Sequence, residues 1–418
     1  MDIKEKLRLI DTLRQRGASP APQPSEPVLP TDHTGMGARR VENKYGAFLY
    51  LEKDFPGTHC HGRTMLGSFP ERALQLLSLV AKESGLRSPE AGKILFIDTE
   101  TTGLSGGSGT CAFLVGIGYF QGKTFRVAQY FMDDFNQEAP LLAELNDVAQ
   151  HFELLVSYNG KSFDIPLLNT RNVLHRMKSP FSRIRHLDLL HTVRRLWGHR
   201  LSECSLTTVE CEIAGFKRGD DVPGFLVPSI YFRYLRDRDD RFLSPVLRHN
   251  RLDIVSLVAI VTRALQQFES PQDECTSPED VVALAKCYET MQRYDEAVSL
   301  YEKFLDGPAS MEIKNRLALR AAFGYKKLRE WERAAQLWQD YISSAPYHPL
   351  PFIELAKHYE HRRKDYRGAL ELVDKALAEI SILESLNGKV SWLEPYKADL
   401  THRRQRLQNR LRSAKSGT

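Results

Sequence analysis

Strand-like and helix-like segments alternate along the middle of the chain, between residues 93 and 268. Three apolar strand-like runs come one after another, and helical and strand-like segments then take turns. Expected strands cover residues 93–98, 111–120, 124–132 and 153–160, and expected helices cover residues 139–152, 163–177 and 244–265. This order predicts an α/β fold with a mixed sheet and helices packed on it. Ser244 is expected to cap the last helix, with Pro245 at its first position.

The residues before this region divide into two parts. Residues 1–17 alternate charged residues with Leu and Ile, which predicts a short amphipathic helix, and a proline-rich linker follows up to residue 32. Residues 33–92 are expected to extend the α/β domain. In them we expect a short strand pair after Arg39 and a helix over residues 68–83.

The chain becomes helical and repetitive after a polar break that begins at Glu269. Three tyrosines recur at intervals of 37 and 34 residues, an alanine precedes each by three residues, and another alanine follows each by nine or ten. These residues are Tyr288, Tyr325 and Tyr359, then Ala285, Ala322 and Ala356, and Ala297, Ala334 and Ala369. The pattern resembles tetratricopeptide repeats, expected over residues 275–382, with one inserted residue in the third. A helical bundle without repeats is the alternative. Residues 383–418 are expected to form a basic helix and tail.

Two carboxylates follow the first buried strand. Asp98 and Glu100 are two residues apart, so on a strand they point to the same side, about 7 Å apart along the chain. Two like charges in a partly buried place raise the pKa of one group unless a cation neutralises them. The alternative is that both lie beyond the strand end, in solvent, with Asp98 capping a turn.

Two further acidic positions each have a structural explanation as well as a functional one. Asp164 begins a helix with Pro166 just inside it, a pattern typical of an N-cap. His249 and Asp253 are four residues apart on the last helix and share a face, which also suits an exposed ion pair. Metal binding is the alternative interpretation at both places.

Taken in order, three segments resemble the three motifs of the DEDD (DnaQ-like) 3′→5′ exonuclease superfamily. They are "DTETTGL" at Asp98, "YNGKSFDIPLL" around Asp164 and "HNRLD" at His249. The segments "LSGGSGTCAFLVGIGYF", "HLDLLHTVRRLW", "SLTTVE", "DVPGFLVPSIYF" and "VLRHNRLDIVSL" are similar to the YprB-type ribonuclease-H-like family, over residues 93 to 265. A tetratricopeptide-like tail also occurs in members of that family. The resemblance implies a ribonuclease-H-like exonuclease domain over residues 93–268.

The resemblance also implies a catalytic site. Carried over by position, Asp98, Glu100, Asp164 and Asp253 would bind two divalent cations, and oxygen ligands suit Mg²⁺ or Mn²⁺. One ion would orient and acidify a water, and the other would stabilise the departing 3′-oxygen. His249 would act as general base. It lies four residues before Asp253, which is the spacing of tyrosine-type members, whereas histidine-type members have five.

Substrate contacts are expected near these residues. Leu104 would wedge against the terminal base, as the matching leucine does in related exonucleases, or pack in the core. The backbone at Thr101 would touch the 3′ end, with Asn159 and Lys161 close enough in sequence to help. Residues 171–200 hold eight Lys or Arg against one acid, Asp188. This run is either a solvated surface or a track for phosphates.

The composition says more about the cellular compartment of the protein than about its binding partner. The net charge of +5 is too small to identify a partner, and six cysteines without a CxxC pair fit a reducing compartment. No apolar run is long enough to span a membrane, so we expect a cytoplasmic protein.

We therefore predict a 3′→5′ exonuclease acting on single-stranded DNA or RNA, with a possible role for the repeats in binding a protein partner. The alternative is a tetratricopeptide-repeat interaction protein with a catalytically weak nuclease-like domain. Endonucleolytic cleavage is a third hypothesis, since the fold permits it.

Overall fold

The protein is described by a computed structural model that covers residues 37–86, 89–103, 109–305, 307, 310–345, 347–388 and 390–416. The helix expected at residues 1–17, the linker up to residue 32 and Leu104 lie outside the described residues.

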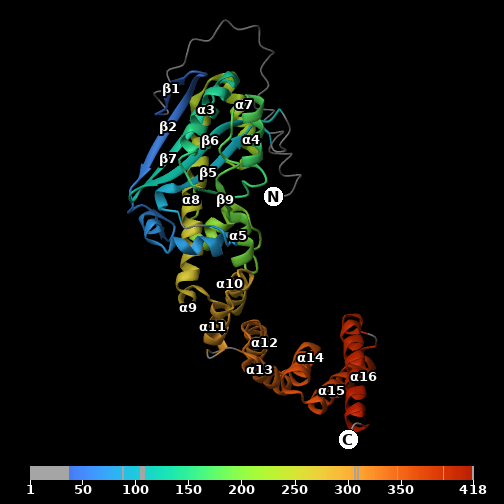
Figure 1. The fold of residues 1–418 in the computed structure, drawn as a ribbon. Coiled ribbons are helices and arrows are strands. Elements are labelled where there is room, and N and C mark those ends of the chain that lie inside the picture. Colours follow the sequence, from blue (N-terminus) through green and yellow to red (C-terminus); the bar gives the residue numbers. More distant parts are fainter. Residues whose placement is uncertain are drawn as a thin grey trace.

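A seven-stranded mixed sheet forms the centre of the first part of the molecule (Figure 1). Its strands, in spatial order, are β1 (Arg39–Asn43), β2 (Gly46–Phe55), β7 (Thr124–Phe131), β6 (Ala112–Gln121), β5 (Ile94–Thr101), β8 (Leu154–Ser157) and β9 (Arg185–Asp188). Strands β5, β8 and β9 run parallel, and the other pairs are antiparallel. A separate two-stranded sheet joins β3 (Cys60–His61) to β4 (Thr64–Met65). The predicted α/β fold with a mixed sheet is confirmed.

Helices cover both faces of this sheet because β5 is apolar on both sides. Ile94 and Phe96 pack in one core cluster, and Leu95 and Ile97 pack in another. The first cluster is covered by α5 (Leu189–Leu196) and most of α8 (Leu243–Glu269), and the second by α3 (Glu138–Ala149), α4 (Asp164–Leu174) and α7 (Val227–Asp237). The end of β5 therefore lies between helices on both sides.

Two local predictions about helices were wrong. Helix α8 begins at Leu243, with Phe242 as its N-cap and no side-chain cap bond, so Ser244 lies inside its first turn. Residues 68–83 do not form one helix. They are broken into η2 (Leu66–Glu71), η3 (Leu74–Leu76) and α2 (Leu77–Ala81). The break is held by tertiary contacts, because Glu269 of α8 accepts a hydrogen bond from the Ala73 N–H and pairs with Arg72.

The rest of the chain is helical and leads away from the sheet as a curved arm (Figure 1). Its helices are α9 (Pro271–Glu274), α10 (Pro278–Thr290), α11 (Tyr294–Leu305), α12 (Met311–Leu328), α13 (Trp331–Ser344), α14 (Pro349–His358), α15 (Tyr366–Asn387) and α16 (Glu394–Ser416). The core cluster on the α8 side of the sheet continues into α10, α11 and α12. The predicted order of an α/β region followed by an all-α region is therefore confirmed.

The alanines singled out by their spacing all lie at helix contacts. Each of the six is fully buried: Ala285, Ala297, Ala322, Ala334, Ala356 and Ala369. The extra residue of the third unit coincides with a π-helical turn, η9 (Tyr359–Arg363), which follows α14. A π turn accommodates one more residue than an α turn, so the unit keeps its packing despite the insertion. Among the helices that the structure describes, none is long and apolar enough to cross a membrane.

Candidate active site

The last residues of β5 bring two carboxylates against helix α8. Phe96 packs in the cluster that contains most of α8, and Asp98 and Glu100 follow it on the same side of the strand. The Asp98 carboxylate accepts a hydrogen bond of 2.9 Å from Asn250 Nδ2, and Glu100 Oε1 lies 3.9 Å from His249 Nε2. The register between β5 and β6 shifts between Glu100 and Thr101, which ends the regular pairing beside these side chains.

A buried amide network holds Asp98 in place. Asn250 is fully buried, and its Oδ1 accepts a hydrogen bond of 2.9 Å from Gln129 Nε2 on β7. This bond fixes the amide orientation, so that Nδ2 faces Asp98. The neighbouring strand makes room for it with Gly116, where a Cβ atom would lie 2.2 Å from Asn250 Oδ1. The sequence analysis did not single out Asn250 or Gln129.

The third carboxylate comes from the start of α4. Asp164 is the first residue of that helix and Phe163 is its N-cap, so the interpretation of Asp164 as an N-cap was wrong. Its carboxylate accepts a hydrogen bond from the Thr99 hydroxyl on β5. Gly160 lies close by, where a Cβ atom would come within 2.4 Å of Ser157 Oγ and 3.1 Å of Asp164 Oδ2. The loop from β8 to α4 therefore needs glycine at that position.

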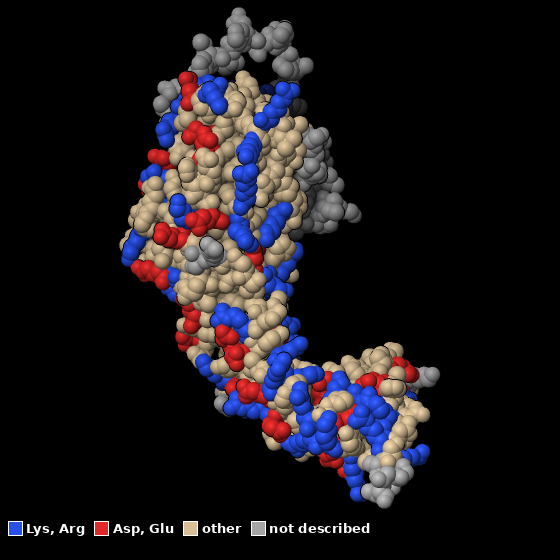
Figure 2. Space-filling view, in the orientation of Figure 1, with Lys and Arg blue, Asp and Glu red and all other residues tan. Residues whose placement is uncertain are grey.

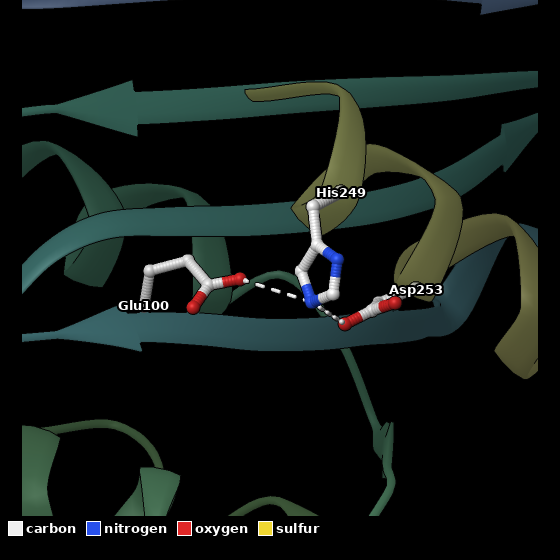
Figure 3. A group of neighbouring side chains, drawn as sticks. All are labelled: Glu100, His249 and Asp253. Atoms are coloured by element: carbon white, nitrogen blue, oxygen red, sulfur yellow. Dashed lines mark ion pairs between the residues drawn. The ribbon is translucent and has the colours of Figure 1, made fainter. Parts of the chain in front are cut away.

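The fourth carboxylate and the imidazole come from α8. His249 Nε2 lies 3.6 Å from Asp253 Oδ2, one helical turn further on. In Figure 3 this nitrogen is directed at Glu100 and Asp253. Atoms of these three residues that are able to bind a metal lie within 4.8 Å of one another.

The pKa values of three carboxyl groups in this cluster are raised. Burial is the main reason that the pKa of Asp98 lies well above its usual value, and the charges of Asp253, Glu100 and Asp164 add to it. Burial is also the first cause for Glu100, followed by the charges of Asp253 and Asp164. Burial raises the pKa of Asp164 to about 6, although the hydrogen bond from Thr99 acts against this. Residues from β5, α4 and α8 thus share one acidic environment in which full ionisation is costly.

An arginine that the sequence analysis did not single out lies against this cluster. Arg218 belongs to the loop between η6 (Glu210–Ala214) and η7 (Gly224–Leu226), and its side chain is 7% exposed. Its Nε and Nη2 donate to the two oxygens of Glu210, at 2.7 and 2.6 Å. Nη2 also donates to Asp253 Oδ1. Burial alone would lower the pKa of Arg218, but its bonds to carboxylates raise it, so the guanidinium stays charged.

The same loop supplies one more carboxylate. Asp221 accepts a hydrogen bond of 2.8 Å from Arg218 Nη1, and both of its oxygens lie 2.9 Å from His249 Nδ1. Burial alone would raise the pKa of Asp221, but these hydrogen bonds outweigh it and lower the pKa. The pKa of Asp221 is thus shifted in the opposite direction from the pKa values of Asp98 and Glu100.

Three of the four expected substrate-binding residues are described, and each makes a contact within the protein. Thr101 ends β5, and its hydroxyl donates to the Gly103 carbonyl. Asn159 has a positive φ of 63°, and its N–H and that of Lys161 donate to the two carboxylate oxygens of Asp188. Asp188 also caps α5, where its side chain accepts a hydrogen bond from the Leu190 N–H. Phe163, beside Asp164, was not singled out, although this large apolar residue is 58% exposed.

The basic run over residues 171–200 is partly used inside the protein. Four of its eight basic residues bond to other parts of the chain: Arg171 to Glu138, Arg185 to Glu83, Arg195 to the Val80 carbonyl, and Arg200 to Asp280. On the face seen in Figure 2, basic and acidic side chains are mixed over much of the surface, and several basic side chains line up along one side of the first part of the molecule. The run is therefore not a continuous track of free cations, which weakens its interpretation as a phosphate path.

Comparisons with known proteins identify relatives of this chain. Residues 95–265 match a family model described as RNase_H superfamily. The chain is also similar to a Bacillus subtilis (strain 168) protein described as "Uncharacterized protein YprB". The two are 32% identical over 360 residues, which cover 84% of this chain and 84% of that protein. The matched segment contains β5, α4 and most of α8, and so every carboxylate of the cluster.

Proposed function

Because this chain belongs to the YprB family and carries a domain of the RNase H superfamily, we propose that it is a metal-dependent nuclease. Its substrate would be single-stranded DNA or RNA, hydrolysed from the 3′ end. The observation that supports the proposal is that metal-binding atoms of Glu100, His249 and Asp253 lie within 4.8 Å of one another, while the charges of Asp253, Glu100 and Asp164 help raise the pKa of the buried Asp98. A purely structural core would gain nothing from such a cluster, because each added carboxylate raises the cost of ionising the others.

The donor set of this cluster fits hard divalent cations. Four carboxylates offer oxygen ligands, which suit Mg²⁺ or Mn²⁺, and their charges are enough to hold two ions. The raised pKa values of Asp98 and Glu100 support the same proposal, since these groups lack sufficient positive charge around them. When bound, such cations supply Lewis acidity and neutralise charge on the phosphodiester.

The chain itself supplies the proton acceptor and the substrate contacts. His249 directs Nε2 to the site, so in this proposal it takes a proton from the attacking water. Thr101, Leu104, Asn159 and Lys161 are proposed to bind the 3′ end of the strand. The exposed ring of Phe163, next to Asp164, adds a surface on which an unpaired base can stack. Only a terminal nucleotide that is unpaired or extruded from a duplex can place its base on Phe163, so the proposed contacts favour single-stranded substrates.

The remaining regions keep the roles proposed from sequence. Residues 33–92 add β1 and β2 to the sheet, and the buried alanines of the helix pairs support tetratricopeptide-like repeats over residues 275–382. We propose that these repeats bind a protein partner and that residues 383–418 act as a basic terminal helix. A cytoplasmic location remains a prediction.

The direction and chemistry of cleavage test the proposal. Single-stranded DNA and RNA of one sequence, labelled at the 5′ end, are incubated with the full-length protein and Mg²⁺ or Mn²⁺. We expect a ladder that shortens from the 3′ end and that disappears with a chelator or in the Asp164→Ala variant. Internal cuts would indicate an endonuclease instead. No degradation of any substrate would favour the interaction protein with a weak nuclease-like domain.

Metal binding is also expected to change the pH dependence of stability. The pKa of Asp164 is about 6 in the folded protein, against 3.8 ordinarily, so between these values the folded state keeps a proton that the unfolded state has lost. In chelator, the free energy of unfolding is therefore expected to fall as pH rises through this range. Mg²⁺ or Mn²⁺ at about a hundred times its Kd should raise the free energy of unfolding by about 2.7 kcal/mol. This increase should be larger above the pH range in which Asp164 ionises than below it.

Urea unfolding followed by circular dichroism, at a series of pH values, measures this effect. Potassium chloride at matched ionic strength serves as the control for general screening. An equal stabilisation by potassium chloride, or a divalent effect that is the same at every pH, would contradict the prediction.

A further inference from the structure

The loop between η6 and η7 contacts the side of the His249 ring that faces away from the acidic cluster. Its Nδ1 lies 2.9 Å from each oxygen of Asp221, while its Nε2 lies 3.9 Å from Glu100 Oε1 and 3.6 Å from Asp253 Oδ2. The imidazole is 13% exposed and Asp221 is 16% exposed, so water competes little for this contact. The two ring nitrogens therefore face different groups: one faces the loop and the other faces the acidic cluster.

We propose that Asp221 is a positioning residue, which keeps the hydrogen of the neutral His249 ring on Nδ1 and leaves the lone pair of Nε2 directed into the site. This inference rests on the proposed nuclease function, in which His249 acts as a general base and needs a free lone pair on that nitrogen. It also accounts for the position of His249 in the sequence. Histidine is shorter than tyrosine. At the tyrosine spacing, His249 therefore acts as a base only if a residue outside α8 sets the orientation of its ring.

The distances decide between the two possible tautomers. Arg218 Nη1 lies 3.2 Å from His249 Nδ1 and would favour the opposite tautomer, in which Nδ1 accepts a hydrogen bond. The carboxylate of Asp221 is nearer and presents two oxygens at 2.9 Å. An unprotonated Nδ1 facing both oxygens would bring lone pairs against lone pairs, whereas an N–H there makes a charge-assisted hydrogen bond. The carboxylates that face Nε2 lie farther away, at 3.6 and 3.9 Å, so the shorter contacts of Nδ1 with Asp221 favour the tautomer with hydrogen on Nδ1.

Asp221 is itself held firmly enough to do this. Arg218 Nη1 donates to Asp221 Oδ2 at 2.8 Å, and the same guanidinium is bound to both oxygens of Glu210. The backbone of the loop is fixed as well, because Arg248 of α8 donates to the Asp220 carbonyl and the Phe216 N–H donates to the Glu210 carbonyl. Phe216 stacks on His61, with ring centroids 3.7 Å apart.

The Asp221→Asn variant tests the proposal. Because Arg218 donates to one side-chain oxygen, the amide is expected to keep its oxygen there and to turn its NH₂ toward Nδ1. This would move the ring hydrogen to Nε2. The matched control is Asp220→Asn, an exposed neighbour whose described contact is made by its backbone carbonyl. Nitrogen chemical shifts of ¹⁵N-histidine-labelled full-length protein, in chelator and at a pH where the ring is neutral, report the tautomer. The His249→Gln variant identifies the resonance.

Activity is measured in parallel on a single-stranded substrate. We expect Nδ1-bound hydrogen in the wild type and in Asp220→Asn, and Nε2-bound hydrogen in Asp221→Asn, with a fall in kcat of about a hundredfold at unchanged KM. An unchanged tautomer in Asp221→Asn, or an unchanged kcat, would overturn the proposal. Failure of the proposed function has a different signature: the wild type would cleave no nucleic acid, while the tautomer measurement would still show whether Asp221 controls His249.

Discussion

The Asp98→Asn variant is expected to lose nearly all hydrolytic activity, with kcat reduced roughly a thousandfold or more, or about 4 kcal/mol in the activation barrier. The amide is nearly the same size as the carboxylate, and its oxygen can still accept the hydrogen bond from Asn250 Nδ2. The fold should therefore persist. What is lost is a negative charge that the proposed divalent cations need, close enough to Asp253, Glu100 and Asp164 for their charges to act on it.

The same variant is expected to be more stable than the wild type when no metal is present. Burial and the charges of Asp253, Glu100 and Asp164 raise the pKa of Asp98, so its ionisation costs stability as pH rises. The amide carries no charge and avoids this cost. The difference in melting temperature between Asp98→Asn and wild type, in chelator, should therefore grow with increasing pH.

This pair of opposite effects separates a metal ligand from a structural residue. A residue needed only for folding would lose activity and stability together. The control is Asp147→Asn, which makes the same chemical change at an exposed position of α3 and should change neither quantity. Cleavage rates under single-turnover conditions and thermal unfolding in chelator are the two measurements. Retention of wild-type activity by Asp98→Asn would contradict the assignment of Asp98 to the site.

The sheet and the helices around it could be predicted because their residues carry local patterns. The run from Ile94 to Ile97 is apolar at every position, as a strand covered on both faces must be, and the structure buries all four residues. Residues 68–83 carry a helical pattern too, yet Pro70 and the contacts of Ala73 with Glu269 break the segment. Those contacts join residues that are distant in sequence, and no local pattern encodes them.

The residues of the site also divide into those that a local sequence pattern predicts and those that it does not. His249 and Asp253 could be paired from sequence because four residues on one helix place them on one face. Arg218 and Asp221 could not, because the stretch "FKRGDDVPG" that contains them has the glycine and aspartate content of an exposed turn. The side chains of Arg218 and Asp221 turn inward from this stretch, and Glu210, to which Arg218 bonds, is itself held by Ser256, which contacts His61. A charged residue in such a stretch gives no signal of burial.

Replacing Arg218 by methionine tests how much the cluster depends on this single cation. Methionine keeps most of the length and the apolar stem but removes the charge, so Glu210, Asp253 and Asp221 lose the group that neutralises them. Glu210 is 1% exposed, and breaking a buried ion pair by removing one partner costs about 3–5 kcal/mol. We expect a loss of unfolding free energy of that order in chelator, measured by urea unfolding.

The matched control for this variant is Lys217→Met, which removes the same charge from the exposed neighbouring residue and should change stability very little. The loss in Arg218→Met should also shrink at low pH, because protonated carboxyl groups no longer need a counter-charge. Divalent cations should offset part of it at neutral pH by binding Asp253 in place of the guanidinium. A loss below about 1 kcal/mol would fall in the range of an exposed ion pair and would contradict the buried role of Arg218.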